Sequence, residues 1–139
     1  MNYPEKLIRG ISSNDFIDSE GRLSSVAFQF EASRNHEKTD EASITWYDNE
    51  EALNIAWNQK SSFREGIQFK AGVAILSRKM LDVVIHRPNV MNALDYERRP
   101  TQDNPYHGNL LMKQGLSNGI KRSIIGALTM MCVDEIIRR

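Results

Sequence analysis

Cysteine is almost absent from this sequence, and long apolar runs are absent altogether. Cys132 is the one cysteine of 139 residues, so no disulfide can form within the chain. It lies in an apolar run, where we expect a buried and inert thiol, because reactive thiols need a positive and partly exposed setting. The longest apolar stretch is too short to cross a bilayer, and the first residues lack the apolar segment of a signal peptide. We therefore expect a cytoplasmic protein that does not enter a membrane.

The signatures of several enzyme and binding classes are also missing. The three histidines are far apart, and no His-x-x-x-His or Cys-x-x-Cys pair occurs, so we predict no metal site and no cofactor. The absence of a Gly-x-Ser-x-Gly elbow and of a glycine-rich phosphate loop argues against a serine hydrolase and a P-loop enzyme. Basic residues surround Tyr96 and Tyr106, yet the net charge is zero, which argues against a nucleic-acid partner.

The remaining composition is that of an ordinary globular domain. Apolar residues make up 40% of the chain and charged residues 26%, so we expect a single α+β domain over residues 1–139. Period-two alternation and buried apolar runs predict five to six short strands of a mainly antiparallel sheet. We place them at residues 5–11, 22–30, 42–47, 67–76, 83–86 and 108–113, with residues 31–41 and 89–107 as loops.

Two helices are expected beside this sheet. A middle helix is predicted over residues 49–59, because Asp48 and Glu51 resemble a capping box at its start. Ser77 is predicted to cap a short helical turn. From residue 118 the apolar spacing predicts a long C-terminal helix, which extends nearly to Arg139.

This C-terminal helix carries apolar residues on most of its circumference. Ile124, Leu128 and Met131 lie on its principal apolar stripe. Such a helix is either enclosed in the core or part of an interface. We predict the interface, formed with another protein or with a second copy of this chain as a homodimer.

Residues 102–109, Gln-Asp-Asn-Pro-Tyr-His-Gly-Asn, are the strongest local signal. Asp103 and Asn104 before a proline favour a turn, and Gly108 allows backbone angles that other residues resist. His107 would then lie at a fixed position at the mouth of a strand, as a candidate acid or base. The alternative is a turn whose histidine only bonds its own loop.

Three arginines are candidates for holding an anion. Arg9 on the first strand could bind a carboxylate or phosphate in two-point fashion, or it could pair with Asp15 or Asp18 in the next loop. Arg98 and Arg99 follow two acidic residues in a charged cluster, so a self-paired loop is their alternative role.

Three segments resemble a group of small bacterial proteins of uncharacterised function. They are Leu-Ile-Arg-Gly-Ile at residues 7–11, Ser-Ser-Val-Ala-Phe at residues 24–28 and Asp-Asn-Pro-Tyr-His at residues 103–107. The resemblance implies a bacterial or phage-associated protein and supplies no activity, substrate or cofactor.

Two functions follow from these observations. The first is a protein-interaction module that uses its C-terminal helix, for which a defence or toxin-related system is one setting. The second is an enzyme or binder of a nucleotide or phosphate-bearing ligand, with His107 as acid or base and Arg9 with Arg98 or Arg99 around the anion, near Asp103 and Asn104. The second function requires Arg9 and His107 to share one cleft.

Overall fold

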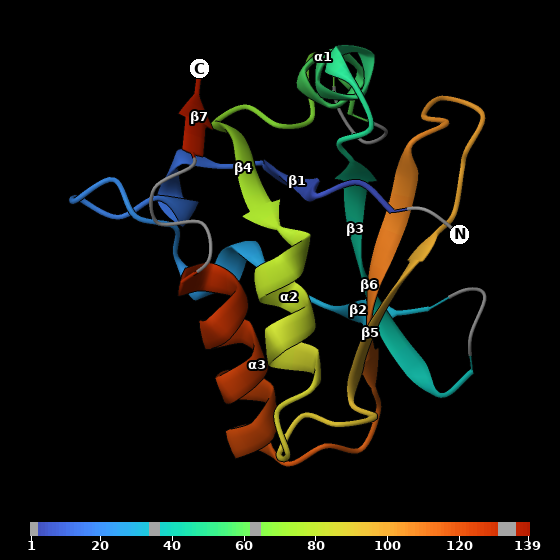
Figure 1. Ribbon diagram of the computed structural model, residues 1–139. Coiled ribbons are helices and arrows are strands. Elements are labelled where there is room, and N and C mark those ends of the chain that lie inside the picture. Colours follow the sequence, from blue (N-terminus) through green and yellow to red (C-terminus); the bar gives the residue numbers. More distant parts are fainter. Residues whose placement is uncertain (1–2, 34–36, 62–64, 131–135) are drawn as a thin grey trace.

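The computed structural model describes residues 3–33, 37–61, 65–130 and 136–139. In this part of the chain, one curled antiparallel sheet packs against three helices (Figure 1), which confirms the predicted α+β class. The elements are β1 (Lys6–Ile11), η1 (Asn14–Phe16), η2 (Ser25–Ala27), β2 (Glu31–Ala32), β3 (Thr39–Trp46), α1 (Glu50–Asn58), β4 (Gly72–Ser77), α2 (Arg78–Ile85), β5 (Leu94–Arg98), β6 (His107–Lys113), α3 (Asn118–Met130) and β7 (Ile136–Arg138), where η denotes a short 3-10 turn.

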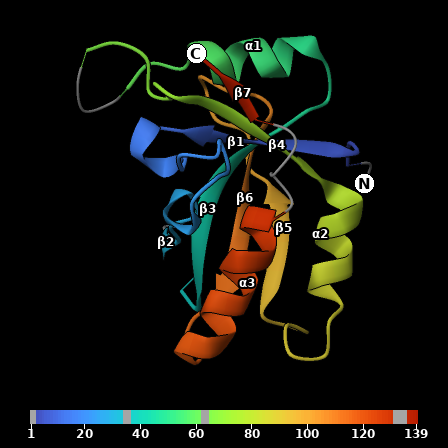
Figure 2. The ribbon, with the colours of Figure 1, turned by 90° about the vertical axis from the view of Figure 1, so that its left-hand side faces the viewer.

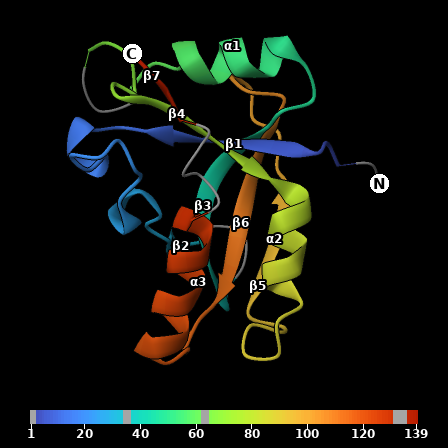
Figure 3. The same ribbon diagram turned by 60° about the vertical axis from the view of Figure 1, so that its left-hand side comes forward.

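The strands are ordered β5-β6-β3-β1-β4-β7, with β2 beside β3, and each pair is antiparallel. The pairing of β1 is unequal on its two sides. All six residues of β1 pair with β4, whereas only Leu7 and Ile8 pair with β3, opposite Trp46 and Thr45. Figures 2 and 3 show that β1 and β4 then cross the direction of β3 and β6. An opening therefore lies between β1 and β3 beyond Ile8.

Helices cover both faces of the sheet. Helices α2 and α3 lie side by side on one face (Figure 1) and enclose the main core, in which Trp46, Ile124 and Leu128 are fully buried. Helix α1 packs on the other face over a smaller cluster of Ile8, Ala56, Val73 and Ile75. Strand β4 is buried on both faces because it lies between these two layers.

The middle helix and the helix after β4 begin with side-chain caps. The predicted middle helix is confirmed as α1, but Asn49 rather than Asp48 caps it, by accepting a hydrogen bond of 3.0 Å from the Ala52 amide. Ser77 caps α2 as predicted, through the Met80 amide at 3.3 Å.

The strand predicted over residues 22–30 is wrong. Ser25–Ala27 forms a single 3-10 turn, and Leu23 makes only an isolated bridge to Ile17. Strand pairing begins further along, where the predicted loop 31–41 contains β2 and the start of β3.

The strand predicted over residues 83–86 is also wrong, because these residues are the end of α2. Leu81 and Val84 point into the core, whereas the Val83 side chain is 62% exposed. A spacing of three between buried positions is that of a helix, and it overrides the strand preference of the β-branched residues.

The C-terminal helix is shorter than predicted. Helix α3 ends at Met130 in the described residues, and Ile136–Arg138 forms β7 against β4 instead of continuing the helix. The outer edge of β4 offers backbone groups that need partners, and β7 supplies them. The predicted connection over residues 89–107 contains β5. Among the described residues, no helix has the length and apolar character required to span a membrane.

Candidate functional site

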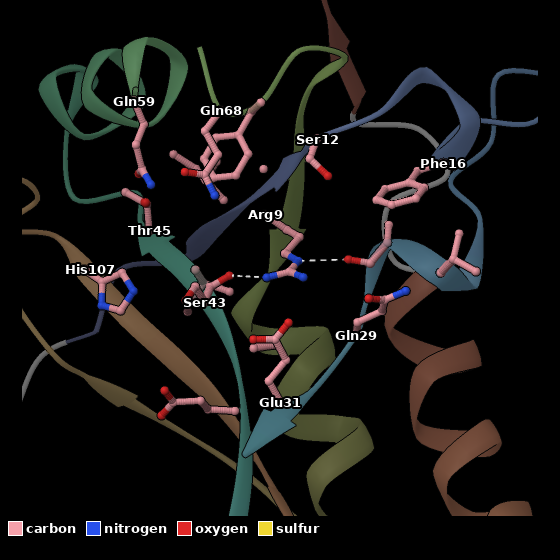
Figure 4. A pocket seen from close by; sticks show the side chains of 18 of the residues that line it. Arg9, Ser12, Phe16, Gln29, Glu31, Ser43, Thr45, Gln59, Gln68 and His107 are labelled. Atoms are coloured by element: carbon pink, nitrogen blue, oxygen red, sulfur yellow. Dashed lines mark hydrogen bonds between the residues drawn. The ribbon is translucent and has the colours of Figure 1, made fainter. Parts of the chain in front are cut away.

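A cavity of about 520 Å³ lies where β1 and β3 separate (Figure 4). Its walls come from β1, η1, η2, β2, β3, the first residue of β6 and the connection between α1 and β4. The volume is within the range of small-molecule sites. The residues that matter for its chemistry are Arg9, Glu31, Glu41, Ser43, Thr45, Gln59, Gln68, Phe69 and His107.

Arg9 lies in the centre of this cavity. Its Nε donates to the Ala27 carbonyl at 3.0 Å, and one terminal nitrogen donates to the Ser43 carbonyl at 2.6 Å (Figure 4). A guanidinium has five N–H groups, so others stay without a protein partner in the described part of the chain. The alternative pairing with Asp15 or Asp18 does not occur.

No carboxylate forms an ion pair with Arg9 among the described residues. Burial lowers the pKa of Arg9 to about 10, and the nearby charge of Glu31 acts in the opposite direction. Arg9 is therefore still charged at neutral pH, in a partly buried position. Such a charge is unfavourable without a counter-ion, so an anion that enters the cavity would be stabilised there.

Two glutamates lie on the wall formed by β2 and β3. Glu31 and Glu41 are directly opposite each other in this strand pair. Glu41 accepts a hydrogen bond of 2.9 Å from the Ser33 hydroxyl. The charged residues of the described part of the lining are one guanidinium and two carboxylates. The carboxylates limit how much negative charge the cavity can accept.

His107 lines the same cavity as Arg9, as the second predicted function requires. It is the first residue of β6 and pairs with Thr45 of β3. Its Nδ1 lies 2.8 Å from the Arg99 carbonyl oxygen. A carbonyl can only accept, so Nδ1 carries the proton and Nε2 of a neutral ring keeps a lone pair.

The other two predicted anion-binding arginines are not in the cavity. Arg98 donates to both carboxylate oxygens of Asp48 at 2.7 and 2.8 Å, and this pairing raises its pKa. Arg99 donates to the Glu97 carboxylate at 3.1 Å. Each of these arginines binds a carboxylate of the chain, outside the cavity that contains Arg9.

Asp103 and Asn104 do not line the cavity either. Asp103 is exposed, whereas Asn104 is only 3% exposed. The Asn104 side chain donates to the Thr45 hydroxyl at 2.9 Å and accepts from the Tyr106 amide at 3.0 Å. Asn104 therefore holds the turn against β3, and that turn places His107 at the cavity wall.

The predicted interface residues are not on the surface. Ile124 and Leu128 are 0% exposed and belong to the main core, and Met131 lies outside the described residues. In the folded chain these two side chains are occupied by its own sheet, so they are not available to a partner. The exposed apolar side chain of α3 is Met130, at 71% exposure.

Several lining residues were missed by the sequence analysis. Gln59 and Gln68 come from the two ends of one connection, and Phe69 follows directly. The one available signal was Gly10, because a Cβ there would clash with the Phe69 ring. The glycine thus lets this ring lie against β1 at the cavity wall.

Comparisons with protein-family models, with curated proteins and with solved structures found no match to this chain. No group of three or more acidic, histidine or cysteine residues able to hold a metal ion occurs in the described ranges. The chemistry of the lining residues is therefore the basis for a functional proposal.

Proposed function

We propose that the cavity between β1 and β3 binds a small molecule through one anionic group held by Arg9. The observation that carries the proposal is the central guanidinium, which forms no ion pair among the described residues. Its two hydrogen bonds go to backbone carbonyls, which do not neutralise its charge. A carboxylate or phosphate oxygen can accept from the remaining N–H groups and offset that charge.

A purely structural role for Arg9 is the competing explanation. Beyond Ile8 the Ser43 carbonyl has no partner on β1, and Arg9 supplies one across the opening. A neutral donor of similar length would serve that purpose without placing a charge in a partly buried position. The structural explanation also leaves the cavity and the unused N–H groups without a role.

Thermal melting with added inorganic phosphate, at matched ionic strength, tests the proposal. At ten times the Kd, phosphate would stabilise the chain by about 1.4 kcal/mol, which is a rise in Tm of about 3–6 °C for this size. Arg9→Gln should remove the rise. The matched control is Arg87→Gln, since Arg87 is exposed and outside the cavity. Equal shifts for wild type and Arg9→Gln would overturn the proposal.

A second variant keeps the test decisive if Arg9→Gln does not fold. Glu31 is exposed, lines the cavity and forms no side-chain hydrogen bond within the described residues. Glu31→Gln removes a negative charge near Arg9, so it should tighten phosphate binding several-fold. Weaker or unchanged binding in this variant would contradict an anion site at Arg9.

A further inference from the structure

The end of the cavity near α1 differs in chemistry from its centre. Figure 4 shows the side-chain amides of Gln59 and Gln68 directed into the cavity above Arg9, with Thr45 and His107 on the adjoining wall. Neither glutamine amide has a hydrogen-bond partner among the described residues. Both side chains are only partly exposed, so these donors and acceptors are available to a ligand in a sheltered position.

Each of these groups suits a flat, polar ring. A glutamine amide offers a donor and an acceptor in one plane, which matches the edge of a nucleobase. The Phe69 ring lies at the same end and supplies an aromatic surface for stacking. His107 adds the acceptor at Nε2, since Nδ1 is already bonded to the Arg99 carbonyl.

The charges of the lining limit the anionic part of the ligand. Among the lining residues that the structure describes, Arg9 is the one cation, and Glu31 and Glu41 lie on the same wall. A triphosphate would bring several negative charges against two carboxylates with one guanidinium to offset them. A single phosphate group fits this balance better.

We propose that the ligand is a nucleoside monophosphate, with its phosphate at Arg9 and its base between Phe69 and the amides of Gln59 and Gln68. This inference rests on the proposed function and specifies the class of its ligand.

Isothermal titration calorimetry on the full chain separates the two proposals. The titrants are the four common nucleoside monophosphates, ribose 5-phosphate, and the triphosphate of the monophosphate that binds best. We expect at least one monophosphate to bind about tenfold more tightly than ribose 5-phosphate, since the base contacts are absent from the sugar phosphate. We expect the triphosphate to bind more weakly than its monophosphate.

The double variant Gln59→Leu with Gln68→Leu should bring monophosphate affinity down to that of ribose 5-phosphate, while ribose 5-phosphate binding stays unchanged. Gln102→Leu is the matched control, because Gln102 is exposed and does not line the cavity. The control should bind all titrants as wild type does.

Equal affinity of wild type for ribose 5-phosphate and for all four monophosphates would overturn the base subsite and leave the anion site at Arg9 intact. If Arg9→Gln binds every phosphate compound as tightly as wild type does, the proposed anion site at Arg9 is itself overturned. The wild-type comparison needs no variant, so it decides the inference even if the double variant does not fold.

Discussion

Gly108→Ala is expected to be among the most destabilising single-methyl changes in this chain. A Cβ at this position would clash with Trp46 Nε1 and with the Glu97 carbonyl oxygen. These two atoms form a hydrogen bond of 3.1 Å that crosses β6 at Gly108 and joins β3 to β5. The φ of Gly108 is not in the left-handed region, so the glycine serves this close approach rather than the unusual backbone angle predicted from sequence.

The size of the effect follows from two contributions. Separating the indole from its acceptor leaves a buried donor unpaired, which costs about 1–3 kcal/mol. Trp46 is 0% exposed and lies against Tyr3 and Tyr96, with ring centroids 4.7 and 5.3 Å away. Moving it therefore adds an overpacking cost of about 1–3 kcal/mol. The sum, about 2–6 kcal/mol, is a large part of the stability of a typical domain.

Urea unfolding followed by tryptophan fluorescence measures this loss. With an m value of about 2 kcal/mol/M, the midpoint should fall by about 1–3 M urea. Gly126→Ala is the control, since no described atom beyond the neighbouring turns of α3 itself lies within 4 Å of a Cβ at that position. Alanine is the better helix former, so this variant should gain about 0.5–1 kcal/mol. A Gly108→Ala midpoint within experimental error of wild type would refute the packing argument.

Three further predictions test the site and the core. Phosphate affinity should stay constant from pH 8 to 9 and fall as the pH rises through about 10, because Arg9 binds the anion only while it is protonated. Calorimetry at these pH values measures the trend, and an affinity that persists far above pH 10 would contradict it. Asn104→Ala should lose about 2–3 kcal/mol in urea unfolding, because the buried Thr45 hydroxyl and the Tyr106 amide both lose a partner; a loss below 0.5 kcal/mol, a threshold about the size of a surface substitution, would argue against the turn's role. Leu128→Ala should lower the free energy of unfolding by about 2–5 kcal/mol without a change of mass in light scattering. A variant of lower mass with the stability of wild type would instead support the predicted interface through α3.

Local signals account for the elements that the sequence analysis placed correctly. The acidic first turn and the alanines of α1 fit a helix with one buried face, and the full apolar character of β4 fits a strand covered on both sides. Val83, Val84 and Ile85 misled the analysis, because β-branched residues favour strands in isolation while packing on the main core places them in a helix. The assignment of β7 depends on pairing with a strand more than 60 residues earlier, which no local pattern reveals.

The residues of the candidate site also divide into those that a local sequence signal marks and those that only the fold brings together. Arg9 and His107 could be singled out because each is an unusual residue type for its place in a strand or turn. Arg98 could not be excluded from the site in advance, because its partner Asp48 lies 50 residues away. Gln59 and Gln68 carry no distinctive sequence signal, and only the folded connection between α1 and β4 directs them to a shared space.

Strands β1 and β3 are joined by just two residue pairs. The sheet therefore consists of two blocks of strands, β5-β6-β3 and β1-β4-β7, with a weak connection between them. A molecule bound between them would act as a bridge, because Arg9 belongs to one block and Thr45 and His107 to the other. Occupancy would then slow amide hydrogen exchange in strands that never touch the ligand, since separation of the blocks would require its release. Binding to this cavity would thus change the rigidity of the whole sheet.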